Sequence, residues 1–192
     1  MSATSLRTLR MMLIAMFAAL TAIGAYIKIP LTVDPFTLQI LFVFLAGALL
    51  GSKWGMISQL VYLGAGLSGL PVFTSGGGIT YIVKPTFGYL IGFVLASYLI
   101  GKIIERSPNP RFSTFFAAHL LGLIPVYGFG MLYLYLSMNT WVGESITFWT
   151  VFLTGFLVNI VGDLMLAFVG AIIAVRLHKV FQQRFHRPIS VR

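Results

Sequence analysis

Acidic side chains are scarce in this sequence, and one of them falls where a charge is costly. The chain of 192 residues has four Asp and Glu, and only Asp163 lies deep inside an apolar stretch. An ionisable group within lipid costs a few kcal/mol and by default marks a functional site. Asn159 lies one helical turn earlier on the same face. This pair suits an amide- or urea-like ligand; the alternative is a structural pair that holds two helices together.

A second pattern, Gly66-Leu67-Ser68-Gly69, has the spelling of the nucleophile motif in six-span rhomboid-type proteases. Such a serine needs a histidine within hydrogen-bond reach. Ser68 ends an apolar stretch that runs outward, whereas His119 lies roughly 9 Å from the inner boundary of its own stretch. In a core of about 30 Å the two fall near opposite faces. A serine protease stays as the alternative from another class, but we expect no enzyme and no catalytic residue.

Several other kinds of chemistry lack the residues they need. The sequence has no G-x-x-x-x-G-K-[ST] motif, so we expect no ATP hydrolysis by this chain itself. It has no Cys and three scattered His, which predicts neither a metal site nor a bound cofactor. The net charge is +9, but the basic residues gather between long apolar runs. This pattern indicates membrane orientation and no nucleic-acid partner.

The composition identifies the elements that position these side chains. The chain is 58% hydrophobic and 9% charged, whereas a soluble domain is about 25% charged. Too few charges are present to cover a water-facing surface, so we predict an all-α, multi-pass membrane protein in contact with the lipid bilayer. A spanning helix needs about 20 apolar residues. A single transmembrane domain, 1–192, is expected to contain six spans at about 11–27, 37–51, 55–70, 86–104, 113–137 and 147–175.

The basic residues predict the orientation. With the N-terminus inside, 11 of the 13 Lys and Arg fall on the inner side, and only Lys28 and Lys84 fall outside. Because Lys and Arg are enriched in cytoplasmic loops, we expect both termini, including a basic tail at 176–192, to be cytoplasmic, with the chain in the cell membrane.

The outer connections differ from the short inner ones. Residues 28–36 and 70–85 combine Pro, Gly and aromatic residues, which indicates shaped loops. Gly76–Gly78 could fold back and cap a cavity, or could form an ordinary exposed turn.

Small residues recur along the first span at the spacing of one helical face. Ala15 and Ala19 lie four residues apart, which allows another helix to approach closely. The stripe is expected either to pack against helices of this chain or to dock a separate subunit.

Three stretches together point to a known family. They are Pro35-Phe36-Thr37-Leu38-Gln39, the stretch from Gly69 to Phe93 with Gly76–Gly78 inside it, and Gly162-Asp163. They resemble motifs of the BioY family, the biotin-binding S-components of energy-coupling factor (ECF) transporters. The similarity extends from about Leu13 to Val175.

The resemblance implies an S-component-like bundle of six helices that captures biotin from outside. It also implies docking on a transmembrane coupling protein that two cytoplasmic ATPases drive. Ala15 and Ala19 would meet the coupling protein, and structured outer loops would close the pocket. The alternatives within transport are an S-component for another small vitamin and a self-sufficient secondary carrier. The carrier lacks support, because no internal repeat or paired set of charges is evident.

The resemblance and the chemistry of biotin together imply the binding residues. The ureido ring needs acceptors and donors, and the thiophane ring and valeryl chain need apolar walls. Asp163, Asn159 and Gln39 suit the first, and Phe73 and Tyr89 suit the second. The implied substrate-binding set is Gln39, Phe73, Gly77, Lys84, Thr86, Tyr89, Asn159 and Asp163.

The biotin carboxylate needs a cation, because a buried charge without a partner is costly. The family often carries a Lys three residues after the Asp of its Gly-Asp motif, but Leu166 stands there in this sequence. The usual Gly-Pro-Thr is here Lys84-Pro85-Thr86. Lys84 lies within the central stretch of similarity, so we expect it to pair with the carboxylate.

Overall fold

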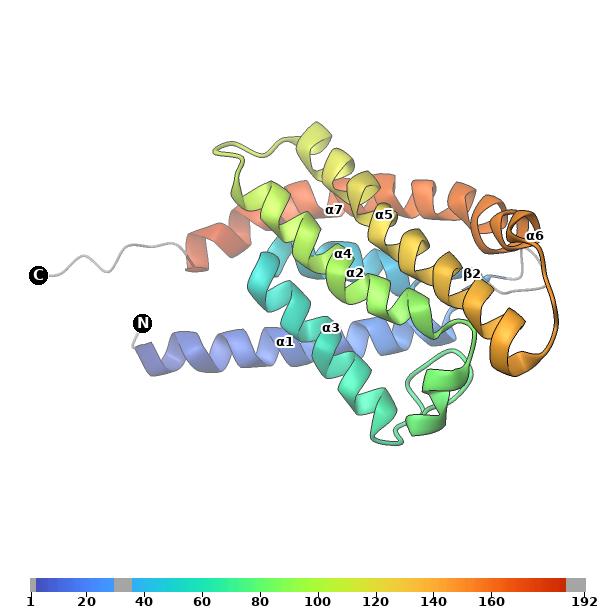
Figure 1. Ribbon diagram of the computed structural model, residues 1–192. Coiled ribbons are helices and arrows are strands. Elements are labelled where there is room, and N and C mark those ends of the chain that lie inside the picture. The colour runs from blue at the N-terminus through green and yellow to red at the C-terminus, as the bar shows by residue number, and fades with distance from the viewer. Residues whose placement is uncertain (1–2, 30–35, 186–192) are drawn as a thin grey trace, which may run out of the picture.

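The computed structural model describes residues 3–29 and 36–185, and the fold is all-helical apart from one short hairpin (Figure 1). The elements before the fourth span are α1 (Ala3–Tyr26), β1 (Lys28–Ile29), β2 (Phe36–Thr37), α2 (Gln39–Leu50), α3 (Ser52–Leu67) and the 3₁₀ turn η1 (Ile79–Val83). The rest are α4 (Phe87–Glu105), α5 (Phe112–Ser137), η2 (Met138–Val142), α6 (Phe148–Phe152), η3 (Leu153–Leu157) and α7 (Val158–Phe185).

Six helical segments form the bundle, which confirms the predicted fold class. Four of them are long and apolar enough to cross a membrane: α1, α4, α5 with η2, and the continuous segment from α6 to α7. The start of α1 and the end of α7 lie at the same end of the bundle (Figure 1). We name this the inner end, following the predicted orientation, and the opposite end the outer end.

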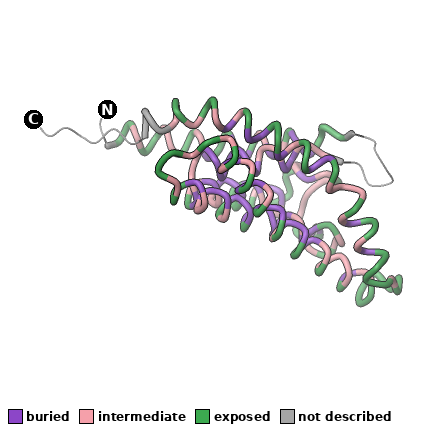
Figure 2. The backbone as a smooth tube through the Cα atoms, turned by 90° about the horizontal axis from the view of Figure 1, so that it is seen from above, coloured by how far each residue is buried: buried purple, intermediate pink, exposed green. Residues whose placement is uncertain are grey.

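The short helix α2 lies at the centre of the bundle. It packs against α1, α3, α4 and α7, and nine of its 12 residues are buried. Neighbours on several sides explain how a helix too short to span lipid alone is tolerated, because protein contacts replace lipid. The tube coloured by burial shows these interior segments in purple and the green outer faces of the longer helices (Figure 2).

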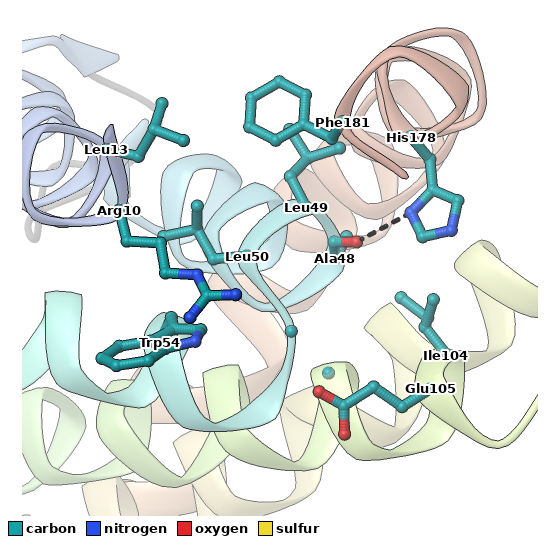
Figure 3. A pocket seen from close by; sticks show the side chains of 12 residues that line it. Arg10, Leu13, Ala48, Leu49, Leu50, Trp54, Ile104, Glu105, His178 and Phe181 are labelled. Atoms are coloured by element: carbon teal, nitrogen blue, oxygen red, sulfur yellow. Dashed lines mark hydrogen bonds between the residues drawn. The ribbon is translucent and has the colours of Figure 1, made fainter. Parts of the chain in front are cut away.

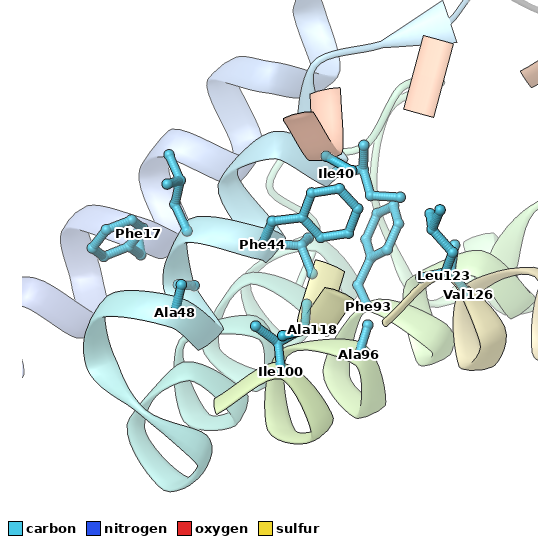
Figure 4. Packing of buried hydrophobic residues seen from close by; sticks show 14 of the residues in the cluster. Phe17, Ile40, Phe44, Ala48, Phe93, Ala96, Ile100, Ala118, Leu123 and Val126 are labelled. Atoms are coloured by element: carbon cyan, nitrogen blue, oxygen red, sulfur yellow. The ribbon is translucent and has the colours of Figure 1, made fainter. Parts of the chain in front are cut away.

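Apolar side chains from four helices meet around α2 (Figure 4). Phe44 and Val43 of α2 are completely buried, as are Ile100 of α4 and Ala118 of α5. Phe17 of α1 joins the same cluster. Dispersion contacts of this kind hold membrane helices together, since lipid gives no hydrophobic drive between them.

Small residues allow α2, α3 and α4 to approach closely at the inner end. A Cβ added at Gly47 would lie 2.5 Å from the carbonyl oxygen of Ser97, and one at Gly101 would lie 2.2 Å from the nitrogen of Ser52. Gly51 joins α2 to α3 with φ of 83°, a conformation that favours glycine. The tight α2–α3 connection and its packing on α4 therefore depend on these glycines.

Two helices extend beyond the predicted spans. Helix α1 begins at Ala3, ahead of the span expected from residue 11, and α7 continues to Phe185, into the predicted tail 176–192. The spans are predicted from runs of apolar residues, and such a run ends at the first charged residues. The helix itself continues, because its backbone hydrogen bonds extend into the polar boundary of the membrane, where long basic side chains are solvated. Residues 186–192 of that tail lie outside the described residues, as do residues 30–35 of the first outer segment.

The second outer segment is a structured loop. Its backbone folds on itself, with Phe73 and Gly76 paired through both of their N–H groups, and Gly78 donating to the carbonyl oxygen of Gly66 at 2.7 Å. Gly76 and Gly78 have φ of 104° and 101°. The loop therefore folds back onto the end of α3, whereas the capping of a cavity by Gly76–Gly78 stays a prediction.

Candidate ligand pocket at the outer end

A cavity of about 230 Å³ opens among the outer ends of the helices. The start of α2, the start of α4, the outer half of α5 and the η3–α7 junction form its walls, and the β-hairpin and the structured loop contribute to its mouth. Polar residues gather in the lining: Lys28, Thr37, Gln39, Thr74, Ser75, Tyr81, Thr86, Tyr89, Tyr127, Thr154, Asn159 and Asp163. The apolar walls are Ile40, Leu90, Phe93, Val126 and Leu134.

The carboxylate of Asp163 lies in this lining and is held by a neighbouring helix. Tyr127 of α5 donates its hydroxyl hydrogen to Oδ2 of Asp163. The Asp163 side chain is 6% exposed, and no other hydrogen bond to it is recorded among the described residues. One turn earlier on the same helix, Asn159 also lines the cavity. One carboxylate oxygen and one amide are therefore directed to the cavity, with the carboxylate fixed by tyrosine.

Aromatic side chains shape the wall beside this carboxylate. Tyr89 of α4 donates to the carbonyl oxygen of Gly155 at 3.0 Å, which joins α4 to the η3 segment. Its ring meets the ring of Tyr127 edge-on, with centroids 6.4 Å apart. Thr86, the residue before α4, also lines the cavity. Three helices are thus tied together around the pocket by tyrosines.

Gln39 connects the hairpin, α2 and α3. Its Nε2 donates to the Tyr62 hydroxyl at 2.7 Å, and its Oε1 accepts from Thr37 at 3.1 Å. The Tyr62 hydroxyl donates in turn to the carbonyl oxygen of Val72 at 3.1 Å. Gln39 therefore lines the pocket and also anchors the structured loop.

The two outer lysines occupy different places. Lys28 lines the cavity and donates from Nζ to the carbonyl oxygen of Thr74 at 2.9 Å. Lys84 donates to the carbonyl oxygen of Ser75 at 2.9 Å, and its Nζ lies 4.9 Å from the centre of the Tyr81 ring. It is not among the lining residues. The structure thus places Lys28, and not the expected Lys84, at the pocket.

Two other expected binding residues lie in the loop and not in the lining. Phe73 is 1% exposed; its ring packs over Gly66 and against Tyr62, with centroids 5.4 Å apart. A Cβ at Gly77 would lie 2.0 Å from the carbonyl oxygen of Leu70. Both residues therefore shape the loop. The remaining expected residues, Gln39, Thr86, Tyr89, Asn159 and Asp163, all meet at the cavity.

Other predictions from the sequence have clear places in the structure. Ala15 and Ala19 lie on the exposed face of α1, away from the bundle. Ser68 directly follows α3, and its hydroxyl donates to the carbonyl oxygen of Ala65. His119 is buried, with its Nδ1 3.0 Å from the carbonyl oxygen of Ala167. This arrangement provides no serine–histidine pair. Among the described residues, no group of three His, Asp or Glu side chains could hold a metal ion.

Comparison with known proteins assigns the chain and its fold to a family. A profile of the BioY family matches residues 1–183. The chain belongs to the BioY family. A probable biotin transporter BioY of Lysinibacillus sphaericus is 56% identical over 175 residues, which cover 91% of this chain and 89% of the relative. The biotin transporter BioY of Thermotoga maritima is 37% identical over 169 residues, covering 88% and 95%.

A solved S-component structure has the same architecture. The crystal structure of the S-component for biotin from an ECF-type ABC transporter matches with a TM-score of 0.80 and 29% identity, over 93% of this chain and 95% of that one. The family resemblance predicted from the sequence is confirmed. Because the curated members are described as transporters, the expectation that the chain is not an enzyme is confirmed as well.

Several lining residues of this BioY family member were not predicted from the sequence, and Tyr127 and Lys28 are the two that enter the chemistry of the pocket. Tyr127 lies in a uniformly apolar helix, where nothing in the spacing distinguishes it from a packing residue. Lys28 was visible as one of two outer lysines, but Lys84 was preferred because it lies within a family motif. The two lysines differ in their position relative to the cavity: the hairpin places Lys28 in the lining, and Lys84 lies outside it.

Proposed function

We propose that this chain is the substrate-binding S-component of a biotin uptake system. It captures biotin from the outer side of the cell membrane of a bacterium or archaeon and delivers it through an ECF-type transporter. The observation that carries the proposal is the outer pocket, where Asp163, Asn159 and Tyr127 meet between apolar walls. The membership in the BioY family supports the same ligand.

The proposed pose follows from matching polar groups. The ureido ring of biotin presents two N–H donors and one carbonyl acceptor, and Asp163 and Asn159 offer an acceptor and an amide on one helix face. Tyr127 occupies one oxygen of Asp163, which leaves the other for a ureido N–H. A hydrogen bond to a charged group is worth about 1.5–3 kcal/mol. Tyr89, Leu90 and Phe93 would contact the thiophane ring and the valeryl chain.

The carboxylate of biotin would lie at the mouth, beside Lys28. The Lys28 ammonium has three donors, of which one is directed to Thr74. We propose Lys28 in place of Lys84, since Lys28 lines the pocket and Lys84 is directed to Ser75. Gln39 and Thr86 complete the proposed lining.

ATP-driven transport would need other subunits, because the sequence contains no phosphate-binding loop with which to hydrolyse ATP. We propose that a transmembrane coupling protein with two cytoplasmic ATPases supplies this function. The exposed stripe at Ala15 and Ala19 is the proposed docking face, since small side chains let a second helix approach closely.

Isothermal titration of the detergent-solubilised protein with biotin, thiamine and riboflavin tests the ligand. We expect binding of biotin alone. Asp163→Asn should weaken it by about 10-fold to 100-fold, from the loss of one charge-assisted hydrogen bond. Glu144→Gln, which removes an exposed carboxylate far from the pocket lining, is the matched control and should bind as the parent does. Preferential binding of thiamine or riboflavin would assign the chain to another vitamin.

A further inference from the structure

A second cavity, of about 290 Å³, lies at the inner end of the bundle (Figure 3). It lies between the start of α1, the α2–α3 connection, the end of α4 and the last turns of α7. Its lining includes Arg10, Trp54, Glu105, His178 and Phe181. Ligand capture at the outer end uses none of these residues.

Two cations converge on one indole at the mouth of this cavity. The Arg10 guanidinium carbon lies 5.6 Å from the centre of the Trp54 ring, and the Lys53 Nζ lies 5.3 Å from it. Figure 3 shows the Arg10 guanidinium beside this ring. Both cations are thus held near one aromatic ring, and an anion bound at this ring would be attracted by both charges.

Glu105 is the only acidic residue lining the described cavity, and other groups already engage it. Its Oε1 accepts from the backbone N–H of Ser52 at 2.7 Å, and its Oε2 accepts from the Ser52 hydroxyl at 2.8 Å. Ser52 begins α3, so the carboxylate also faces the positive end of a helix dipole. No ion pair between Glu105 and Arg10 is recorded in the described part of the chain. The cations therefore keep their capacity for an external anion.

The rest of the cavity is apolar. Leu13 of α1, Leu49 and Leu50 of α2 and Phe181 of α7 line it, so a ligand with a charged head and a hydrocarbon body fits better than a bare ion. Tryptophan is also the aromatic side chain that favours the membrane–water boundary. The described inner ends of the neighbouring helices add further bases, including Lys102, Arg106 and Lys179.

We propose that this cavity binds an anionic phospholipid of the inner leaflet. Its phosphate would contact Arg10, which lines the cavity, and attract Lys53, which lies outside the lining but beside the same Trp54 ring. Its glycerol backbone and first acyl carbons would lie against Leu13, Leu49 and Phe181. Basic pockets between spanning helices on the cytoplasmic side bind acidic lipid head groups by the same physics. The inference is independent of the ligand bound at the outer end.

Quenching of Trp54 fluorescence by brominated lipids tests the proposal. Trp141→Phe and Trp149→Phe leave Trp54 as the sole tryptophan, since the chain has three. This parent is reconstituted in phosphatidylcholine nanodiscs with a fixed fraction of brominated phosphatidylglycerol or brominated phosphatidylcholine. We expect stronger quenching by the anionic lipid at equal fraction.

A charge-removing variant and its control distinguish lipid binding at this cavity from attraction of the lipid by the total positive charge of the inner end. Arg10→Gln with Lys53→Gln should lower the relative affinity for phosphatidylglycerol roughly 25-fold, about fivefold for each charge. Lys102→Gln with Arg106→Gln removes the same charge from the same end of the bundle but leaves both cations beside Trp54 in place, and should retain the preference. Thermal melting by circular dichroism verifies that both variants remain folded.

Three outcomes would overturn the proposal. Equal quenching by both lipids in the parent would mean that the cavity does not select the anionic head group. An equal loss of preference in both double variants would mean that total charge, and not the cavity, attracts the lipid. Displacement of the lipid by soluble glycerol 3-phosphate at low millimolar concentration would assign the cavity to a free phosphate ester.

Discussion

At the scale of single residues, the negative and the positive group of the outer pocket lie in different surroundings. Asp163 is inside the bundle and fixed by Tyr127, whereas Lys28 is at the hairpin, where water reaches its ammonium group. A neutral ring system can enter the interior if its donors are matched, but a ligand carboxylate is less costly to bind near water. This division favours a ligand with a polar neutral head and an anionic tail.

The two outer lysines give a direct comparison. Lys28→Met should weaken biotin binding by about 10-fold to 100-fold, because it removes a charge-assisted contact worth about 1.5–3 kcal/mol. Lys84→Met should leave affinity within about threefold, because Lys84 lies outside the lining and its ammonium group is directed to the Ser75 carbonyl oxygen and the Tyr81 ring. Titration with biotin and with uncharged biotin amide measures both. A larger loss in Lys84→Met than in Lys28→Met would restore Lys84 as the carboxylate partner.

Tyr127 is expected to position Asp163 and not to contact the ligand through its hydroxyl. Tyr127→Phe removes the hydrogen bond to Oδ2 while keeping the ring against Tyr89 and Phe156. Biotin affinity should fall by roughly fivefold to tenfold, less than for a charge-assisted bond made directly to the ligand, because Tyr127 acts only by positioning Asp163. Tyr98→Phe, which removes an exposed hydroxyl on α4 outside the lining, serves as a comparison in the same titration. Unchanged affinity in Tyr127→Phe would mean that packing alone holds Asp163.

At the scale of elements, α1 has two distinct faces. Phe17, Thr21 and Ala25 are buried against the bundle, while Met11, Met16 and Ala19 are exposed. Internal packing therefore uses the face opposite to the Ala15–Ala19 stripe. The exposed face is flat near the alanines, and unbranched methionines beside them can adapt to a partner surface.

Ala19→Trp should block assembly with the coupling protein without affecting the ligand pocket. A bulky ring prevents close approach of a partner helix, but the side chain points away from the bundle. Co-purification with the coupling subunits measures assembly, and biotin titration measures the pocket. Ile124→Trp, at an exposed site on α5, is the control and should assemble normally. A complex yield equal to the control would exclude this face.

The structured loop is the element on which most of the outer contacts converge. Lys28 and Lys84 donate to its Thr74 and Ser75 carbonyl oxygens. Beyond its middle, Tyr133 donates to Ile82, and the Trp141 indole donates to Val83 at 2.7 Å. These bonds connect the loop to the hairpin and to the α5–η2 segment, so it forms a wall of the pocket held at several points.

At the scale of the whole molecule, the two cavities lie at opposite ends of one bundle. The outer cavity has tyrosines, threonines and one carboxylate, and the inner one has arginine, tryptophan and surrounding bases. A central core around Phe44 and Ile100 separates them. This arrangement agrees with a subunit that takes its ligand from one side and is oriented by charge on the other.

Cysteine labelling can test the orientation, because the chain contains no native Cys. Thr80→Cys, in the structured loop, should react with an impermeant maleimide in intact cells. Asn109→Cys, in the α4–α5 connection, should react only after the cells are opened. Both positions are exposed, so accessibility differs only by side. Labelling of Asn109→Cys in intact cells would reverse the predicted topology.

The sequence by itself determined much of the architecture and part of the pocket. Apolar run length and scarce charge predict helices in lipid, because each backbone polar group there must be satisfied within its own segment. Asp163 was recognisable as a candidate because an ionisable side chain in an apolar helix is costly. Asn159 was then added to the prediction, because residues four apart lie on the same face of a helix.

Only the tertiary structure decided which residues meet. In the sequence, the position of Tyr127 looks like that of an apolar packing residue. Its role becomes clear only because its hydroxyl donates to Asp163, which lies 36 positions later in another helix. Lys28 and Lys84 are equivalent by charge, but the hairpin turns one to the cavity while the loop carbonyl of Ser75 engages the other. Local periodicity determines which face of a helix is polar, whereas long-range packing determines which faces meet and what the space between them can bind.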